Sequence, residues 1–171
     1  MQKQNSGTAA EISPAAPAEE FDLGSLLGYR LVRLSSAIGA LAEQEAQEVA
    51  GLTLPEYRVL TVLHSLGPTG VVSLQRAMRI DKAWISRTLA KLVDKRLVAS
   101  GADNQDGRRS LFRVTAKGKS VAQALIERAV IRQARIFQGF EKQEVITLIS
   151  LLSRIQGNVE VNDGQDEPRP L

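Results

Sequence analysis

The chain contains no cysteine and only one histidine among its 171 residues. Disulfides, zinc fingers, iron–sulfur clusters and thiol redox sensing are therefore excluded, and one histidine is too few for a conventional transition-metal site. We expect neither a metal nor a cofactor. No stretch approaches the ~20 apolar residues of a membrane-spanning helix, and no basic start followed by an apolar block is present. The expectation is a cytoplasmic protein without a membrane partner.

Recognisable catalytic motifs are also missing. There is no cysteine nucleophile, no glycine-rich phosphate-binding loop, and no set of serine, histidine and aspartate in a familiar context. These absences argue against an enzyme. Apolar residues make up 43% of the chain and charged residues 24%, which is typical of an ordinary globular domain.

Positive charge is concentrated in the middle of the chain. The formal net charge is +3, but acidic residues predominate in residues 1–22 and 160–171. Residues 23–159 therefore carry about +9, and residues 76–119 alone carry about +8. A local field of that sign suits a polyanion such as nucleic acid. A solvated basic face without a partner is the alternative.

Composition and periodicity separate the ends of the chain from its helices. Residues 1–20 have no hydrophobic period and predict a disordered leader, and residues 160–171 predict a disordered acidic tail. Between them we expect one domain over residues 21–159. Apolar residues spaced by three and four predict long helices over about 23–50, 115–138 and 142–156.

Residues 54–115 have the pattern of a winged helix-turn-helix, in which two helices joined by a turn precede a β-hairpin. Thr53, Pro55 and Glu56 form a capping box that opens a helix ending near Leu66. The further elements are a strand stub at Val71–Val72, a short helix capped by Ser73, a helix over 82–95 capped by Asp81, and strands at 97–99 and 111–114. The predicted fold class is mainly α with a small β wing.

The helix over 82–95 separates apolar from polar side chains. Ile85, Leu89 and Leu92 share one face. The other faces hold most of the polar side chains, which are available to a groove: Lys82, Ser86, Arg87, Lys91 and Lys95. The DNA-binding interpretation places four residues at base edges or a thymine methyl group in the major groove and two at phosphates. These are Lys82, Ala83, Ser86 and Arg87 at the bases, and Arg76 and Lys91 at the phosphates.

Each of these assignments has a structural alternative. Arg87 could instead form an ion pair with Asp94 or another local acid, because exposed pairs of that kind are common, although they are weak. Lys91 and Lys95 could be solvated residues without a partner. Trp84, the only tryptophan, is expected to pack as part of the core.

The stretch from Asp103 to Gly118 predicts a hairpin with a basic tip, followed by the start of a helix. Arg108 is the candidate for the minor groove, where narrow A·T-rich DNA concentrates negative potential. Asp106 would orient the guanidinium of Arg108, and Arg109 would contact the DNA backbone. A plain surface turn is the alternative.

The last predicted helix has an apolar face that is too wide to be covered by contact with one neighbouring helix. Its apolar residues are Val145, Ile146, Leu148, Ile149, Leu151, Leu152 and Ile155. A second copy of the chain is the economical occupant of such a face. A helix central to a monomer core is the alternative.

Four segments fit one known pattern. They are Leu54–Leu60, which opens the second helix, Asp81–Arg87, which opens the recognition helix, the Asp106-x-Arg108 wing, and Val114-Thr115-x-x-Gly118. Together they resemble the MarR family of bacterial transcription regulators, over about residues 23–157. Arg96 stands where many members have glycine, and Trp84 is bulky for its position.

The resemblance implies an obligate homodimer with dimerisation helices over about 23–50 and 116–157. Its two winged lobes would bind a pseudopalindromic operator in double-stranded DNA. It further implies a repressor that is released by a small aromatic or anionic effector. The cysteine oxidation that some members use as a trigger is excluded here. A constitutive regulator without an effector remains open.

Candidate effector-binding residues lie on the first two helices. Tyr57 and His64 share a face of the second helix, which the family fold would turn toward a crevice between the dimerisation helices and the DNA-binding lobe. Arg30 and Arg33 would supply positive charge for an anionic ligand. The alternatives are core positions for Tyr57 and His64, and solvation or local pairing for the two arginines.

A winged helix used only for protein contact is the competing function, because a fold does not dictate a function. The paired arginines at the wing tip and the basic recognition helix favour DNA. The sequence therefore predicts a sequence-specific DNA-binding transcription regulator.

Overall fold

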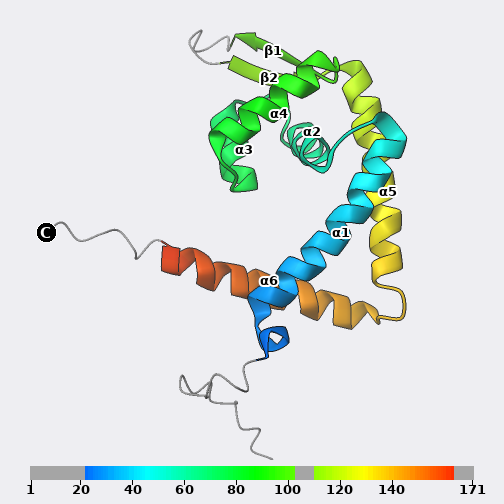
Figure 1. The fold of residues 1–171 in the computed structure, drawn as a ribbon, viewed down its shortest axis with the longest axis vertical. Helices are drawn as coiled ribbons and strands as arrows, with labels where there is room; N and C mark the ends of the chain where they lie inside the picture. Colours follow the sequence, from blue (N-terminus) through cyan, green and yellow to red (C-terminus); the bar gives the residue numbers. More distant parts are fainter. Residues whose placement is uncertain (1–21, 103–109, 164–171) are drawn as a thin grey trace, which may run out of the picture. The chain divides into compact units, whose positions relative to one another are not determined.

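The computed structural model describes residues 22–102 and 110–163. Its elements in chain order (Figure 1) are η2 Leu23–Ser25, α1 Leu27–Ala50, α2 Leu54–Leu66, α3 Val71–Met78, α4 Lys82–Asp94, β1 Val98–Ala102, β2 Ser110–Val114, α5 Ala116–Ile136 and α6 Lys142–Asp163. The fold is mainly helical with one small antiparallel sheet, as predicted. The chain divides into two compact units, Met1–Ala42 and Glu43–Leu171.

The first unit contains η2 and the greater part of α1. The Asp22 carboxylate accepts a hydrogen bond from the Gly24 N–H at 2.8 Å and so caps the short turn that precedes the long helix. The predicted apolar stripe is present on α1, and most of its leucines are exposed, with 55% of Leu34 and 49% of Leu41 accessible. Those side chains are therefore available for contact with another surface.

The second unit holds the hydrophobic core. Helix α2 packs against α4 and α5, and α3 packs against α4. The largest fully buried side chains come from the junction before α2, from all four of these helices and from β1: Leu52, Val59, Leu60, Leu63, Leu74, Ile85, Leu89, Leu92, Val98 and Leu125. These residues hold the helix-turn-helix and the wing together as one lobe.

The predicted capping box at the start of α2 is confirmed. The Glu56 N–H donates to the Thr53 hydroxyl, and the Glu56 carboxylate accepts from the Thr53 N–H at 2.8 Å. Asp81 likewise caps α4 by accepting from the Trp84 N–H at 2.9 Å. Both caps follow from side chains three residues apart, which is why local sequence predicts them.

The predictions for the start of α3 are wrong. Val71 and Val72 belong to the helix, and Gly70 rather than Ser73 is its N-cap. The strand pairing expected there occurs instead at Thr69, whose N–H and C=O exchange hydrogen bonds with Phe112 at 3.0 and 2.9 Å. Because Thr69 forms the backbone hydrogen bonds with the sheet, Val71 is not needed for strand pairing. It begins the helix and packs on the core.

The wing is a two-stranded antiparallel hairpin in which Val98 pairs with Val114 and Ala102 with Ser110. Strand β1 begins one residue later and ends three residues later than predicted. Residues 103–109 lie outside the described part of the chain. The predicted wing-tip residues Asp106, Arg108 and Arg109 are therefore not placed.

The turn from α4 into β1 is a Schellman motif. The Leu97 N–H donates to the Leu92 carbonyl at 3.0 Å, and the Arg96 N–H donates to the Val93 carbonyl at 2.8 Å. Arg96 sits at the left-handed position of this motif with φ 59°. Glycine is the residue that usually occupies that position, because it has no Cβ to clash.

Arg96→Gly is expected to raise the free energy of unfolding by about 1 kcal/mol, because glycine relieves the left-handed strain. Chemical denaturation would measure the change. Arg96→Ala is the matched control, since it removes the guanidinium but keeps the strained backbone. A glycine variant no more stable than the alanine variant would contradict this account of the turn.

The last two helices differ from prediction mainly at their ends. Thr115 caps α5 as predicted, but the helix stops at Ile136. Helix α6 runs to Asp163, so the predicted disordered tail begins within the helix at residues 160–163. The Gln156 amide donates to the Glu160 carboxylate at 2.9 Å, one turn on, which supports the extension. Residues 1–20 and 164–171 lie outside the described residues.

Over residues 22–102 and 110–163, no helix is long and apolar enough to cross a membrane.

Candidate nucleic-acid interface

Helix α4 is divided into a buried and an exposed face. Ile85, Thr88, Leu89 and Leu92 are buried against the lobe, which confirms the predicted apolar face. The Thr88 hydroxyl donates to the Trp84 carbonyl at 2.9 Å, so this buried polar group is satisfied. The helix is therefore anchored along one side and presents the other to solvent.

All six residues predicted to contact DNA from the helices are exposed. They are Arg76 on α3 and Lys82, Ala83, Ser86, Arg87 and Lys91 on α4. A groove of about 720 Å³ is lined by Arg76 and Lys82 together with Ser110, the first residue of β2. Residues from α3, α4 and β2 thus line one open surface that carries positive charge.

Two polar residues of this groove were not predicted to lie on the DNA-facing surface. Thr69 and Ser73 also line the groove beside Arg76. Thr69 lies there because it pairs with β2, and Ser73 because it is in the first turn of α3 rather than at its cap. The sequence signal that could have indicated them is that both are polar and precede Arg76, which was predicted to bind a phosphate.

The ion pair considered for Arg87 is not formed. Among the described residues, the acids that form ion pairs are Glu45, Glu56 and Glu160, and Asp94 is not one of them. Arg87 is exposed, one residue before the buried Thr88. Its guanidinium is thus accessible to a ligand.

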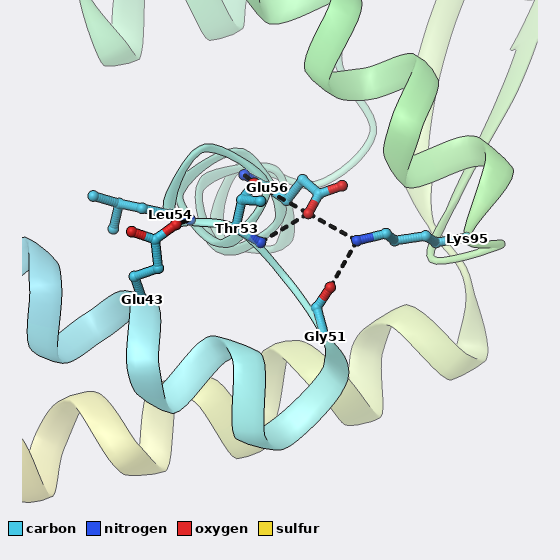
Figure 2. A network of polar contacts seen from close by, with 6 residues as sticks. All are labelled: Glu43, Gly51, Thr53, Leu54, Glu56 and Lys95. Atoms are coloured by element: carbon cyan, nitrogen blue, oxygen red, sulfur yellow. Dashed lines mark hydrogen bonds and ion pairs between the residues drawn. The ribbon is translucent and has the colours of Figure 1, made fainter.

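Lys95 does not share this exposed surface. Its ammonium donates to the Gly51 carbonyl and to the Glu56 carboxylate, both at 2.8 Å (Figure 2). The expectation that Lys95 is presented or solvated is therefore wrong. The partner Glu56 is 39 residues earlier, which is a tertiary relation that helical periodicity does not reveal.

Trp84 is partly buried and packs against the core, as expected. It precedes the buried Ile85 on α4. Its bulk therefore contributes to seating the helix on the lobe.

Tyr57 and His64 both lie close to residues of α5 but not in one shared site. The Tyr57 hydroxyl accepts from the Arg132 guanidinium at 3.3 Å, and Arg132 also pairs with Glu45. His64 lines a cavity of about 400 Å³ with Arg113 and Lys119. The core alternative therefore describes Tyr57, whereas His64 borders an accessible cationic cavity.

Arg132 is a buried residue that sequence reasoning missed. It is 9% exposed and joins α5 to α1 and α2 through Glu45 and Tyr57. The available signal was its position seven residues after the buried Leu125, which places it on the apolar face of α5. A charged residue at such a position requires a partner.

Arg30 and Arg33 belong to the first unit, apart from the unit of Tyr57 and His64. The Arg30 guanidinium donates to the Gly24 carbonyl, and the Arg33 guanidinium lies 5.8 Å from the centre of the Tyr29 ring. Local contacts, one of the alternatives considered for these two arginines, are therefore present. Within the first unit, both arginines line one cavity with Tyr29.

The surroundings of Glu56 lower the pKa of its carboxyl group. Burial raises the pKa of this carboxyl group, but hydrogen bonds from Lys95 and Thr53 and the charge of Lys95 favour the carboxylate. The favourable contacts prevail and hold the pKa below 4.5. The group is only 2% exposed and therefore depends on these partners for its charge.

The lowered pKa of Glu56 predicts a loss of stability in acid. The contribution of the carboxylate is present above its ordinary pKa and disappears as the pH falls through the lowered value. We expect Glu56→Gln to show a shallower decline of the free energy of unfolding than the wild type between about pH 5 and pH 3. Urea denaturation at each pH would measure it, and parallel declines would rule out this role for Glu56.

The part of the chain that carries this surface is similar in sequence to known transcriptional regulators. The MarR family model matches residues 52–110, which contain the helix-turn-helix and most of the wing. YxaD of Bacillus subtilis, an uncharacterized HTH-type transcriptional regulator, is 29% identical over 113 residues, which are 66% of this chain and 79% of that protein.

Solved structures resemble the chain over most of its length. A probable transcriptional regulator from Pseudomonas aeruginosa is 27% identical with a TM-score of 0.70, covering 78% of this chain and 99% of that one. The PcaV transcriptional regulator from Streptomyces coelicolor, solved with its natural ligand, is 26% identical with a TM-score of 0.70, covering 80% of this chain and 96% of that one.

These relatives are transcriptional regulators rather than enzymes. The matched segment contains α4, most of the residues that line the groove beside Arg76, and the first residue of β2. In its winged helix-turn-helix fold, and in sequence over residues 52–110, the chain is similar to the MarR family of transcriptional regulators.

Proposed function

We propose that this regulator is a homodimeric repressor that binds a pseudopalindromic operator in double-stranded DNA and is released by a small aromatic or anionic effector. The observation that carries the proposal is the division of α4, whose apolar side is buried while Lys82, Ser86 and Arg87 are exposed. A helix anchored in this way can lie in a major groove. As a regulator of bacterial transcription, the protein would act in the cytoplasm.

The proposed contacts sort into base readout and phosphate binding. Lys82, Ser86 and Arg87 would approach base edges, and Ala83 a thymine methyl group. Arg76 and Lys91 would bind phosphates, which position a protein without reading sequence. The groove shared by Arg76 and Lys82 supports a common DNA-facing surface for α3 and α4.

The wing supplies the proposed minor-groove contact. Its strands end at Ala102 and Ser110, and Ser110 lines the same groove as Arg76. We assign Arg108 to the minor groove, Asp106 to its orientation and Arg109 to the DNA backbone.

Dimerisation is supported by apolar side chains that are exposed in the single chain. On α6, 50% of Ile146, 53% of Ile149 and 47% of Leu151 remain accessible, in a helix that also carries other large apolar residues. Exposed apolar area of this kind marks an interaction surface. Two-fold symmetry would pair the same face of both copies and match a pseudopalindromic site.

An effector is supported by the solved complex of the PcaV regulator with its natural ligand. Within this chain, the cavity bordered by His64, Arg113 and Lys119 offers cationic groups to an anion. In the first unit, Arg30 and Arg33 line a second cavity together with the aromatic ring of Tyr29. An effector that prefers one arrangement of the lobes would change DNA affinity by its differential binding.

A salt titration tests the proposed DNA binding directly. Affinity would be measured for DNA from the protein's own upstream region and for random duplex, at roughly 50 to 200 mM salt. Specific binding with a steep slope is expected for an operator-reading dimer. Equal and weak binding to both duplexes would favour either an operator elsewhere in the genome or a function in protein contact. Selection of bound fragments from the whole genome would distinguish these two explanations.

Arg87→Ala is expected to weaken operator binding by about 1–3 kcal/mol and to relax the preference at one base pair. Fluorescence anisotropy with single-base operator variants would measure both effects. Arg128→Ala is the matched control, because Arg128 is also exposed but lies on α5, outside the groove. Equal losses for the two variants would indicate a general effect of charge instead of base readout.

A further inference from the structure

One ionic cluster joins the end of the recognition helix to two other helices (Figure 2). Lys95 is the C-cap residue of α4, and its ammonium donates to the Gly51 carbonyl and the Glu56 carboxylate, both at 2.8 Å. Gly51 directly follows α1, and Glu56 lies in the first turn of α2. A single side chain therefore connects the ends of three helices.

The acceptors of Lys95 are themselves held in place. The Glu56 carboxylate accepts from the Thr53 N–H at 2.8 Å and from the Thr53 hydroxyl at 3.1 Å. On the other side of the junction, the Leu54 N–H donates to the Glu43 carboxylate of α1 at 3.2 Å. Lys95 cannot move away without leaving a buried carboxylate unpaired, which is strongly unfavourable.

Stability alone does not require this arrangement. An apolar pair of similar volume often stabilises a fold as well as a buried ion pair does. Apolar contacts, however, allow helices to slide and rotate, whereas bonds from one ammonium to two fixed acceptors define a direction. The feature that the cluster adds is the orientation of the end of α4 relative to the α1–α2 junction.

We propose that Lys95 is a positioning residue for operator recognition, whose bonds to Gly51 and Glu56 set the direction of α4 and thereby the separation of the two recognition helices in the dimer. The inference rests on the proposed function, because α1 would carry dimer contacts. Half-sites are one helical turn apart, ~34–36 Å, so both helices must be correctly placed at once.

The orientation can be measured without DNA. Since the chain has no cysteine, Ala90→Cys on the exposed side of α4 gives one spin-label site per protomer. Electron–electron double resonance would compare this protein with the same protein carrying Glu56→Gln and Lys95→Met, a pair of changes that preserves net charge. We expect the distance distribution between the protomers to broaden about twofold.

An equally narrow distribution in the double variant would overturn the proposal. The double variant leaves no unpaired buried charge, so it should remain folded, and thermal unfolding would verify this at the temperature of measurement. Lys95→Arg, which keeps the charge and several donors, is expected to retain a narrower distribution than the double variant.

DNA binding provides a second test with a definite sign. Glu56→Gln removes a negative charge, so electrostatics alone predicts tighter binding. The positioning role predicts the opposite, a loss of about tenfold in operator affinity with an unchanged salt slope. The control is Asp94→Asn, which removes the same charge at an exposed position next to Lys95 and should bind at least as tightly as wild type.

The outcomes separate the two proposals. Wild-type protein that does not distinguish any operator from random duplex would contradict the proposed function, and the distance measurement would still test the orientation. Wild-type specificity together with undiminished binding by Glu56→Gln would overturn the positioning role alone. A reduced salt slope in Lys95→Met, by about one phosphate contact, would instead indicate that Lys95 binds DNA directly.

Discussion

Gly118→Ala is expected to lower the free energy of unfolding by about 3 kcal/mol, because a Cβ at this position has no space. It would lie 2.0 Å from the Leu97 carbonyl oxygen and 2.7 Å from a methyl group of Val114. The oxygen belongs to the backbone at the start of the wing, so it cannot turn away as a flexible side chain could. Helix α5 would have to separate from β1.

The close approach at Gly118 follows from the way Thr115 starts α5. The Thr115 N–H donates to the Leu97 carbonyl at 3.0 Å, and its hydroxyl donates to the Arg96 carbonyl at 2.9 Å. The same hydroxyl accepts from the Gly118 N–H at 3.0 Å. The first turn of α5 is therefore bonded directly onto the chain that enters β1, and only glycine fits there.

Helix propensity and packing predict opposite signs for this substitution. Alanine inside a helix is normally more favourable than glycine by about 1 kcal/mol. A contact of 2.0 Å with a fixed carbonyl outweighs that gain, since overpacking of this severity costs more. Urea denaturation would measure the result, with Gly101→Ala as the control, because a Cβ at Gly101 meets nothing within 4 Å. Equal stability of the two variants would exclude the steric account.

The sequence predicts elements whose cause is local. The caps by Thr53, Asp81 and Thr115 each depend on a side chain bonding to the backbone three residues later. The apolar face of α4 depends on a period of three to four residues. Both kinds of signal are complete within one helix, and the structure confirms them. The glycine in the pattern Val114-Thr115-x-x-Gly118 was likewise recognised, although its steric reason was not.

Features that depend on distant residues were missed. The partners of Lys95 are 39 and 44 residues earlier, and Glu45 is 87 residues before Arg132. Because no short-range pattern reports such pairs, Lys95 was assigned to the exposed basic face. The start of α3 was misplaced for the same reason, since Thr69 is paired by Phe112 from the wing. The exposure of the helix residues proposed to contact DNA was predicted correctly, because exposure on a helix follows from the period of its apolar residues.

Leu148→Glu is expected to convert the proposed homodimer into monomers at micromolar concentration. Leu148 lies on the apolar side of α6 and is 39% exposed in the single chain. In a symmetric dimer both copies would lose a buried leucine and gain a buried carboxylate. The loss would be about 3 kcal/mol or more of association free energy, and sedimentation velocity would report the change in mass.

Ser150→Glu is the matched control for this prediction. Ser150 is exposed on the polar side of α6, which it shares with Gln143, Thr147 and Arg154, so the same charge there should leave the dimer intact. If Leu148→Glu also sedimented as a dimer, this apolar face would not be the subunit interface. A monomeric wild type would contradict dimerisation itself. Dissociation by Leu148→Glu alone, accompanied by a loss of operator binding, would link the apolar face of α6 to recognition of a two-fold site.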